Sequence, residues 1–524
     1  MKKVISLVLA ALLALSLAPI VYADELSCPY TGAPVKLRGY AADLNMTGAP
    51  DCPVALVYKE AVGNIDVDWE LVTFDAGFDT KARLYFNSGD IPDIVWFRSP
   101  EIIQDYGTSG LFLDFNQYKE LTPNWNAAVA QRPGLLMYQT LDGKQLTMHD
   151  VLDDYPSESF FANTALLKEY GLKAPTNLEE FEAVCDALLE ADPTITPFHT
   201  FWKLSYYSGI FSSLIDAKRG LYYDLDAKVW KHAMLEEDSN YKQLIELLAK
   251  YYKKGYFNPE FTTMSDEQTK NLIETGKWGL TFTYFEQMND WYSVPRSENL
   301  PFEYDAILPP VAEGVKPSVS CGYVSDSPYW CFAISAKTAH PELCVSWCDT
   351  MLSDKVATAF QWGIEGVSYE VDADGNKHWI QSFLDKGSQA KLDLGVWNIN
   401  GPRFITKRDD LSNMMTESPK IQETRRYIAE ALINGEVTSY YYPGSPTLSD
   451  DALDEFSQIS AAIKTVIDQN EALFVLGMRS LDEWDDYIAE VKSVGDVARL
   501  VQLYNEGVQK PERVQADGRV YLKP

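Results

Sequence analysis

The spacing of apolar residues changes twice within residues 64–97. In the first part, apolar and acidic side chains alternate, which is the period-two pattern of a strand with one covered face. Residues 78–88 then follow a helical repeat that stops before Gly89, a residue that readily takes the left-handed conformation at a helix end. Residues 94–97 form a short apolar run, typical of parallel strands buried on both faces. The alternating apolar positions are Ile65, Val67, Trp69 and Leu71. The pattern predicts a β-α-β unit.

The rest of the chain shows a similar alternation of strand and helix patterns, which predicts an α/β fold. A mature chain of about 500 residues is longer than one core supports, so we expect two or more lobes of roughly 150–250 residues each. Strands are expected at residues 35–40 and 330–334, and helices at residues 53–62, 178–188, 244–252 and 340–352. Three helices begin with cap signals, which are Thr176 with Glu179, Ser265 with Gln268, and Ser480 with Glu483.

The composition is strongly acidic. Lysine and arginine total 45 residues against 76 aspartates and glutamates, which gives a formal net charge of −31, and the chain has no basic run. Nucleic acid is disfavoured as a partner because its binding needs a positive footprint. An anionic membrane surface is disfavoured for the same reason. Aromatic residues make up 13% of the chain. Most of them must fill cores, but sugar-binding clefts also use flat aromatic faces.

The N-terminus has the pattern of a secretory signal. Two lysines precede an apolar stretch that runs to Tyr22, and a small residue, Ala23, follows. Residues 1–23 are therefore predicted to be a signal peptide that is cleaved after Ala23. The alternative is an uncleaved membrane anchor, but Pro19 suits a signal peptide better than a spanning helix. No other segment of the sequence is long and apolar enough to span a bilayer.

Several stretches carry a resemblance to one family. Residues 87–97 (NSGDIPDIVWF) and 157–181 resemble two of its signatures, and residues 363–375 (GIEGVSYEVDADG) resemble a signature of its large subclass. The C-terminal stretches 441–452 and 472–495 are similar to the tail of that subclass. The chain thus resembles the family 1 extracellular solute-binding proteins of ABC importers, in the large subclass that includes alginate-binding proteins. The resemblance covers nearly all of the mature chain.

The resemblance implies a fold and a partner. The fold is a two-lobed, type II periplasmic-binding-protein-like clamshell of α/β lobes, with hinge strands and an extended helical C-terminal region. The first lobe is expected at residues 24–152 and 309–362, and the second at residues 153–308 and 363–524, with residues 304–310 as a hinge strand that returns to the first lobe. The implied partner is a membrane permease pair driven by a cytoplasmic ATPase. A monomer is expected at the outer face of the cytoplasmic membrane, in the periplasm or outside the cell.

Two features of the family are not carried over to this chain. The alginate-binding relatives have a calcium loop where this chain reads ADPTITP (residues 191–197), and one carboxylate cannot supply the six to eight oxygens that calcium takes. Neither a metal nor a cofactor is therefore expected. Many Gram-positive relatives are lipoproteins, but acidic residues precede Cys28 where an apolar region should continue, so lipid anchoring at Cys28 is not favoured.

The chain has seven cysteines, and the odd number leaves at least one thiol without a disulfide. The candidate bridges are Cys28–Cys52 and Cys321–Cys331. Cys344 and Cys348 lie four residues apart on one expected helix, where they suit either a metal pair or core packing. Core packing is favoured because no third and fourth ligand are spaced to complete a tetrahedral site.

The sequence contains no catalytic motif. Five histidines are present, and none has a metalloprotease spacing or lies beside a nucleophile motif. Carboxylate pairs such as Glu179–Glu180, Asp450–Asp451 and Asp485–Asp486 are interpreted as solvated helix surface. The protein is therefore not expected to be an enzyme.

A sugar-binding cleft combines aromatic faces with groups that hydrogen-bond hydroxyls. The side chains predicted to bind the ligand are Trp96, Tyr284, Trp330, Trp362, Glu365, Trp397, Asn400 and Arg403. For each of them, ordinary packing in a core or loop is the alternative. The first hypothesis for the ligand is a carbohydrate, most simply a neutral oligosaccharide. Two other hypotheses stay open, namely a solute-binding protein for a peptide or polyamine, and a secreted enzyme that acts on polysaccharides.

Overall fold

The structure is a computed structural model that describes residues 26–43, 51–73, 76–97, 103, 106–107, 109–131, 133–136, 138–149, 158–200, 204–285, 287–288, 303–319, 331–373, 375, 377–384, 386, 388–396, 419–439, 444–509, 513–516 and 519–522. The predicted signal peptide lies outside these ranges, as do four of the predicted binding residues, Trp330, Trp397, Asn400 and Arg403.

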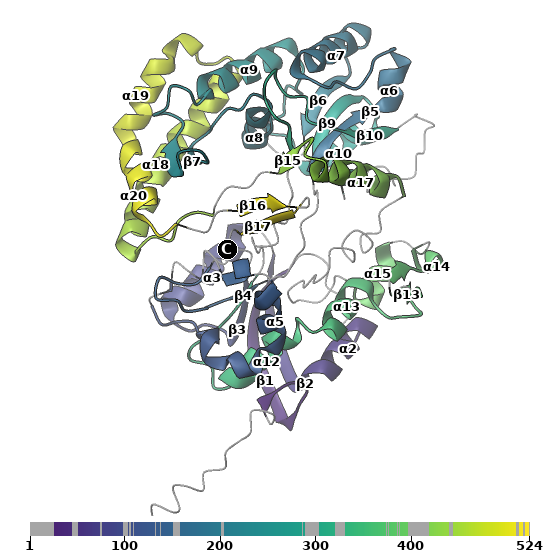
Figure 1. The fold of residues 1–524 in the computed structure, drawn as a ribbon, viewed down its shortest axis with the longest axis vertical. Helices are drawn as coiled ribbons and strands as arrows, with labels where there is room; N and C mark the ends of the chain where they lie inside the picture. Colours follow the sequence, from purple (N-terminus) through teal and green to yellow (C-terminus); the bar gives the residue numbers. More distant parts are fainter. Residues whose placement is uncertain are drawn as a thin grey trace, which may run out of the picture.

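The first lobe, in the lower half of Figure 1, is built on a five-stranded sheet of order β2-β1-β3-β12-β4. The central strand β3 is parallel to β1, whereas β12 is antiparallel to β3 and to β4. The strands are β1 (Tyr30–Asp43), β2 (Gly63–Thr73), β3 (Ile94–Phe97), β4 (Met148–His149) and β12 (Cys331–Ile334). The helices are α2 (Pro53–Val62), α3 (Ala76–Ser88), η2 (Phe115–Leu121), α5 (Pro123–Gln131), η3 (Pro133–Leu136), α12 (Pro341–Thr350), α13 (Asp354–Trp362), α14 (Gln381–Leu384) and α15 (Ser388–Leu394).

The predicted β-α-β unit is confirmed in this lobe. β2, α3 and β3 occupy the expected residues, and Gly89 has a φ of +69° directly after the helix. All four residues of β3 are buried, as the short apolar run predicted. The first strand, β1, lies between β2 and β3 and is parallel to both, so the two strands of the unit are not neighbours in the sheet.

The second lobe, in the upper half of Figure 1, is built on a four-stranded sheet of order β10-β5-β9-β6. β9 is antiparallel to β5 and parallel to β6. The strands are β5 (Glu158–Asn163), β6 (Thr196–Thr200), β9 (Trp278–Tyr284) and β10 (Tyr304–Ile307). The helices are α6 (Thr164–Glu169), α7 (Leu178–Ala191), α8 (Leu204–Leu214), α9 (Tyr241–Lys254), α10 (Asp266–Glu274) and α17 (Pro419–Ile433).

A layer of C-terminal helices covers one side of the second lobe (Figure 1). It packs against α9 and against a separate hairpin of two strands. The layer consists of α18 (Asp450–Val475), η4 (Leu481–Glu483), α19 (Trp484–Val494) and α20 (Val497–Glu506), and the hairpin of β7 (Leu221–Asp224) and β8 (Val229–His232). A last hairpin, β16 (Arg513–Ala516) and β17 (Arg519–Leu522), lies between the lobes near η3. None of the helices in the described part of the chain has the length and apolarity that a bilayer crossing requires.

Each lobe has its own hydrophobic core. Residues such as Leu37, Ile94 and Phe332 belong to the first core, and residues such as Phe198 and Leu280 to the second. The chain therefore passes from the first lobe to the second between β4 and β5, returns between β11 (Ser318–Val319) and β12, and passes again to the second between α15 and α17.

The lobes differ from the expected ranges at two places. Residues 309–319 were expected in the first lobe, but Val311 packs in the second core and its carbonyl accepts a hydrogen bond from Leu178. β10, expected as a hinge strand, pairs with β5 inside the second sheet. Residues 363–396 were expected in the second lobe, but Phe383 and Val396 pack against Val54 of α2. The resemblance assigned these segments by their order along the chain, whereas the lobe in which a segment packs depends on contacts with residues far away in the sequence.

Two of the three predicted capping boxes differ from the structure. The box of Ser265 and Gln268 is confirmed at α10. At α7 the cap is Asn177 instead of Thr176, and Glu180 accepts hydrogen bonds from the backbone and hydroxyl of Thr176. Ser480 caps only a short 3₁₀ turn, where it accepts a hydrogen bond from Asp482. Both of these residue pairs had the required spacing, but at α7 the neighbouring Asn177 provides the cap, and at Ser480 the hydroxyl accepts from the amide two residues later instead of three.

The candidate bridge Cys28–Cys52 is wrong, because both thiols are free. The Cys28 amide donates to Ser346 of α12, whereas the Cys52 sulfur lies against Gly395. Cys344 and Cys348 are buried in the first core, which confirms core packing for this pair. The partner in the other candidate bridge, Cys321, lies outside the described residues, so that bridge stays a prediction.

Three buried histidines make stability depend on pH. Burial lowers the pKa of His149 and of His199 to about 3 and that of His232 to about 4. An unfolded histidine has a pKa of about 6.5. Below that pH the three histidines bind protons in the unfolded chain but not in the native chain. The free energy of unfolding therefore falls as the pH falls from about 6.5 towards 4.

We expect His149→Gln to reduce this pH dependence. Glutamine keeps an amide for the neighbours Gln145 and Thr147, whose side chains lie 3.3 and 3.2 Å from Nε2 of His149, but it takes up no proton. The free energy of unfolding, measured by urea titration between pH 7 and pH 4, should then fall less steeply than in the parent, by up to about 1.4 kcal/mol per pH unit. The control is His378→Gln, at a side chain that is 52% exposed. Equal slopes for the parent and His149→Gln would contradict the prediction.

Candidate functional site

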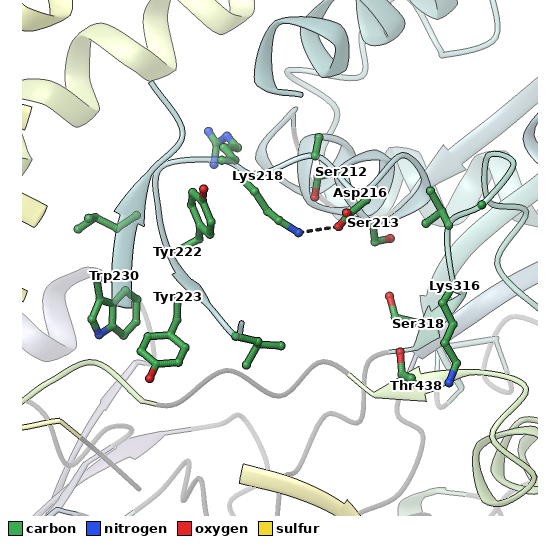
Figure 2. Close-up of a pocket in the computed structure, with 16 residues that line it drawn as sticks. Ser212, Ser213, Asp216, Lys218, Tyr222, Tyr223, Trp230, Lys316, Ser318 and Thr438 are labelled. Atoms are coloured by element: carbon green, nitrogen blue, oxygen red, sulfur yellow. Dashed lines mark hydrogen bonds and ion pairs between the residues drawn. The ribbon is translucent and has the colours of Figure 1, made fainter. Parts of the chain in front are cut away.

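The second lobe contains a pocket of about 610 Å³. It lies between the end of α8, the β7–β8 hairpin and the strand pair of β11 with β15 (Thr438–Ser439). Figure 2 shows these elements around the open volume, and Figure 1 places them on the side of the second lobe that is directed towards the first. The residues that line the pocket are Ser212, Ser213, Asp216, Ala217, Lys218, Arg219, Leu221, Tyr222, Tyr223, Leu225, Trp230, Gly314, Val315, Lys316, Ser318 and Thr438.

Aromatic side chains form the hairpin side of the pocket (Figure 2). Tyr223 pairs with Trp230 across the two strands, and their ring centroids are 5.5 Å apart in an edge-to-face arrangement. Tyr222, the preceding residue, is half-buried and also lines the pocket. The hairpin turn forms because Asp224 accepts hydrogen bonds from the amides of Asp226 and Ala227, and because Lys228 has a φ of +56°. The turn brings the two strands together, and their aromatic side chains line this side of the pocket.

Hydroxyl groups and a lysine lie across from the aromatic side chains (Figure 2). Ser318 and Thr438 are register partners in the short parallel pair of β11 and β15. The Thr438 amide donates to the carbonyl of Pro317 at 2.9 Å, which fixes this edge. Lys316 is exposed beside it. The pocket therefore places groups that can hydrogen-bond a polyol opposite groups that can pack on its apolar face.

Charge in the pocket is largely paired. Lys218 forms an ion pair of 2.5 Å with Asp216, which has a φ of +50°. Arg219 forms a two-pronged pair with Glu471 of α18, through Nε at 2.8 Å and Nη2 at 2.7 Å. Burial lowers the pKa of Arg219, but the hydrogen bonds and charge of Glu471 outweigh burial and raise that pKa. Each of these two cations thus has a carboxylate partner.

None of the predicted binding residues that the structure describes lines this pocket. Trp96 is 2% exposed in the first core, and Trp362 is fully buried with its ring 5.1 Å from that of Trp379. Glu365 is exposed in the loop after α13, and Tyr284 is half-buried at the end of β9. Trp362 and Glu365 lie close together, whereas Trp96 and Tyr284 lie in different lobes. A ligand contact at each of these residues stays a prediction.

Sequence reasoning missed the aromatic side chains of the hairpin. The signal was present as two short runs, LYYD and VWKH, separated by the turn-forming residues 225–228. That pattern predicts a hairpin, but it does not show that the hairpin borders a pocket. The pocket forms only where the hairpin meets α8 and β11, which are distant in sequence.

The described residues offer no cluster of three or more metal-binding side chains. In the loop at residues 191–197, where the resemblance had suggested comparison with a calcium loop, Asp192 accepts hydrogen bonds from the amide and hydroxyl of Thr194. The Lys277 ammonium lies 3.5 Å from the same carboxylate and donates to the Thr194 hydroxyl. Asp192 is thus engaged by residues of the chain itself.

The carboxylate pairs lie on helix surfaces. Glu179 and Glu180 are exposed in the first turn of α7, and Asp485 and Asp486 are exposed in the first turn of α19. A carboxylate near a helix N-terminus interacts favourably with the helix dipole. Their positions agree with the interpretation of these pairs as solvated surface.

Comparisons with known proteins agree with this architecture. Residues 45–358 match the family model described as bacterial extracellular solute-binding protein. No curated protein sequence matches the chain.

Solved structures of similar fold cover almost the whole chain. The alginate-binding protein AlgQ2, in a structure without calcium ion, is 19% identical with a TM-score of 0.72, and the match covers 91% of this chain and 98% of that one. A solute-binding protein described as HMO-binding and associated with an ABC transporter, from Bifidobacterium longum infantis, is 18% identical with a TM-score of 0.68 over 91% and 98% of the two chains. The substrate-binding protein FusA of S. pneumoniae, in complex with kestose, is 17% identical with a TM-score of 0.67 over 90% and 99%.

These likenesses agree with the two-lobed α/β fold, and the family model spans more than half of the sequence. The chain belongs to the bacterial extracellular solute-binding protein family.

Proposed function

We propose that this protein is the substrate-binding component of an ABC importer, and that it captures an oligosaccharide between its lobes and delivers it to a membrane permease. The observation that carries the proposal is the pocket of about 610 Å³ on the side of the second lobe directed towards the first, with aromatic side chains along one side and hydroxyls across from them. That volume lies within the range of small-molecule sites, about 300–1,000 Å³. The similar structures of AlgQ2, the HMO-binding protein and FusA support a carbohydrate as the ligand class.

Membership of an extracellular family implies that the protein is exported. We propose that it acts at the outer face of the cytoplasmic membrane as a monomer, after cleavage of residues 1–23 and without a lipid on Cys28. It binds its ligand and makes or breaks no bond in it. Transport requires only that the ligand binds the closed arrangement of the lobes more tightly than the open one. Each tenfold difference in affinity between the two arrangements corresponds to about 1.4 kcal/mol.

The pocket disfavours a polyamine as the ligand. Its lining has three cationic side chains, Lys218, Arg219 and Lys316, against the single carboxylate of Asp216. Asp216 is already paired with Lys218, so the lining offers no free carboxylate to the ammonium groups of such a ligand. Paired charges, hydroxyls and aromatic faces together suit a polyol.

A thermal-shift screen tests the proposed function. The panel holds gluco-, fructo- and manno-oligosaccharides of two to six units and oligouronates of the same lengths, with a tripeptide set as the control class. A ligand that binds only the native state stabilises it by about 2.7 kcal/mol at a hundredfold excess over Kd, so at least one saccharide should raise Tm. A shift with peptides and none with saccharides would contradict the proposal.

We expect Tyr222→Ala to weaken binding of the best panel saccharide about tenfold in Kd, because a ring packed on a sugar contributes about 1.4 kcal/mol. The measurement is isothermal titration calorimetry. Tyr427→Ala is the matched control, since Tyr427 is 46% exposed on α17 and does not line the pocket. Equal Kd values for both variants and the parent would show that this pocket is not the binding site.

A further inference from the structure

The hairpin that carries the aromatic side chains of the pocket is not part of either main sheet. β7 and β8 form a separate two-stranded sheet. An isolated two-stranded hairpin is marginally stable in water, so its position must be set by packing against other elements. Because Tyr222, Tyr223 and Trp230 all lie on it, whatever holds the hairpin also sets the shape of the pocket.

Helix α20 holds the β8 strand at Trp230. The Asn505 side chain accepts a hydrogen bond from the Trp230 amide at 2.8 Å and donates to the Trp230 carbonyl at 2.9 Å. The indole nitrogen of Trp230 donates to Gln509 at 2.9 Å. The Trp230 ring packs edge-on against Tyr504 with centroids 4.9 Å apart, and Tyr504 stacks on Phe456 of α18 at 4.5 Å. One amide side chain thus serves both backbone groups of a residue that lines the pocket.

Helix α18 holds the turn that leads into β7. Glu471 is 1% exposed and accepts from Arg219 through both carboxylate oxygens. It also accepts from the Tyr241 hydroxyl at 2.7 Å, and that hydroxyl lies 2.8 Å from the hydroxyl of Tyr487 on α19. Burial, together with the charge of Glu471, raises the pKa of Tyr241, so the phenol stays a donor. Arg219 lines the pocket three residues before Tyr222, so the network fixes the start of the hairpin.

These contacts come from outside the segment that the family model matches. The match ends at residue 358, whereas Glu471, Tyr487 and Asn505 lie beyond it. The helices α18 and α20 also bond to each other through a second two-pronged pair, from Arg499 to Glu455 at 2.8 and 2.7 Å. Glu455 and Arg499 do not line the pocket. Of these two similar ion pairs, Arg219–Glu471 reaches the pocket wall and Arg499–Glu455 does not.

We propose that two residues of the C-terminal helices, Asn505 of α20 and Glu471 of α18, are positioning residues that set the aromatic side of the pocket through Trp230 and Arg219. This inference rests on the proposed function and extends it to residues that touch no ligand themselves. The affinity of the protein for its saccharide then depends on the layer that follows the matched segment of the chain.

The test measures Kd by isothermal titration calorimetry, with the panel saccharide of lowest Kd as the probe. Asn505→Ala and Glu471→Gln should each raise Kd tenfold or more. Asn505→Asp keeps the acceptor for the Trp230 amide and should restore part of the affinity. The matched controls are Glu455→Gln, which weakens the ion pair between α18 and Arg499, and Gln502→Ala, which removes an amide that bonds Glu506 within α20. Both controls should leave Kd within twofold of the parent.

A double-variant cycle separates positioning from general destabilisation. If Asn505 acts on the aromatic side of the pocket, Asn505→Ala should have a smaller effect on Kd in a Tyr222→Ala background than in the parent. Additive effects of these two substitutions would contradict the proposal. Melting temperatures of all variants show that each is folded at the temperature of the titration.

Hydrogen exchange gives a readout that needs no ligand. In Asn505→Ala, exchange should become at least tenfold faster in residues 221–232, with the strands of the main sheet of the second lobe unchanged. Unchanged exchange in residues 221–232 would overturn the positioning role. If the parent protein binds no saccharide of the panel, the proposed function is contradicted. If the parent binds a saccharide and the variants bind it with the same Kd, only this inference is overturned.

Discussion

The pocket depends on one constraint, which is that a two-stranded hairpin cannot hold its shape alone in water. The chain meets this constraint with contacts of very long range. Trp230 bonds to side chains 275 and 279 positions later, and Arg219 to a carboxylate 252 positions later. Burying the ring of Trp230 and satisfying both its backbone groups removes the freedom that the hairpin would otherwise have. Trp230 and the Tyr223 ring that packs on it therefore have fixed positions before any ligand arrives, which lowers the entropy cost of binding.

The division into two hydrophobic cores allows the lobes to move as separate rigid bodies. Each sheet is covered by its own helices, so each lobe buries its apolar surface without help from the other. The chain crosses between the lobes at three points in the sequence, and the hairpin of β16 and β17 lies between them. Rigid bodies joined by a few segments can close over a ligand at little cost in packing, because closure leaves both cores intact. A ligand that contacts both lobes can then shift the balance towards the closed arrangement.

Sequence patterns predicted the parts of this fold that local chemistry decides. The β-α-β unit of β2, α3 and β3 followed from a change of period and from Gly89, and the cap of α10 followed from Ser265 and Gln268. The resemblance to a family predicted two lobes.

The sequence patterns missed those features of the fold and the pocket that depend on contacts between residues far apart in the sequence. Residues 363–396 were expected in the second lobe, but they pack against α2, which lies about three hundred positions earlier in the sequence. The pocket was missed for the same reason, since the aromatic residues of LYYD and VWKH gain their role only where α8, β11 and α20 surround them. Trp96 was predicted to bind because it lies at the end of a strand, and Trp362 because glycines follow it, but in this structure both side chains fill the interior.

The central claim is that two lobes close on an oligosaccharide. Small-angle X-ray scattering of the purified chain, with and without the saccharide of highest affinity, tests it most directly. Closure predicts a smaller radius of gyration and a shorter maximum dimension at saturating saccharide. Scattering curves that superimpose at saturation would contradict the account.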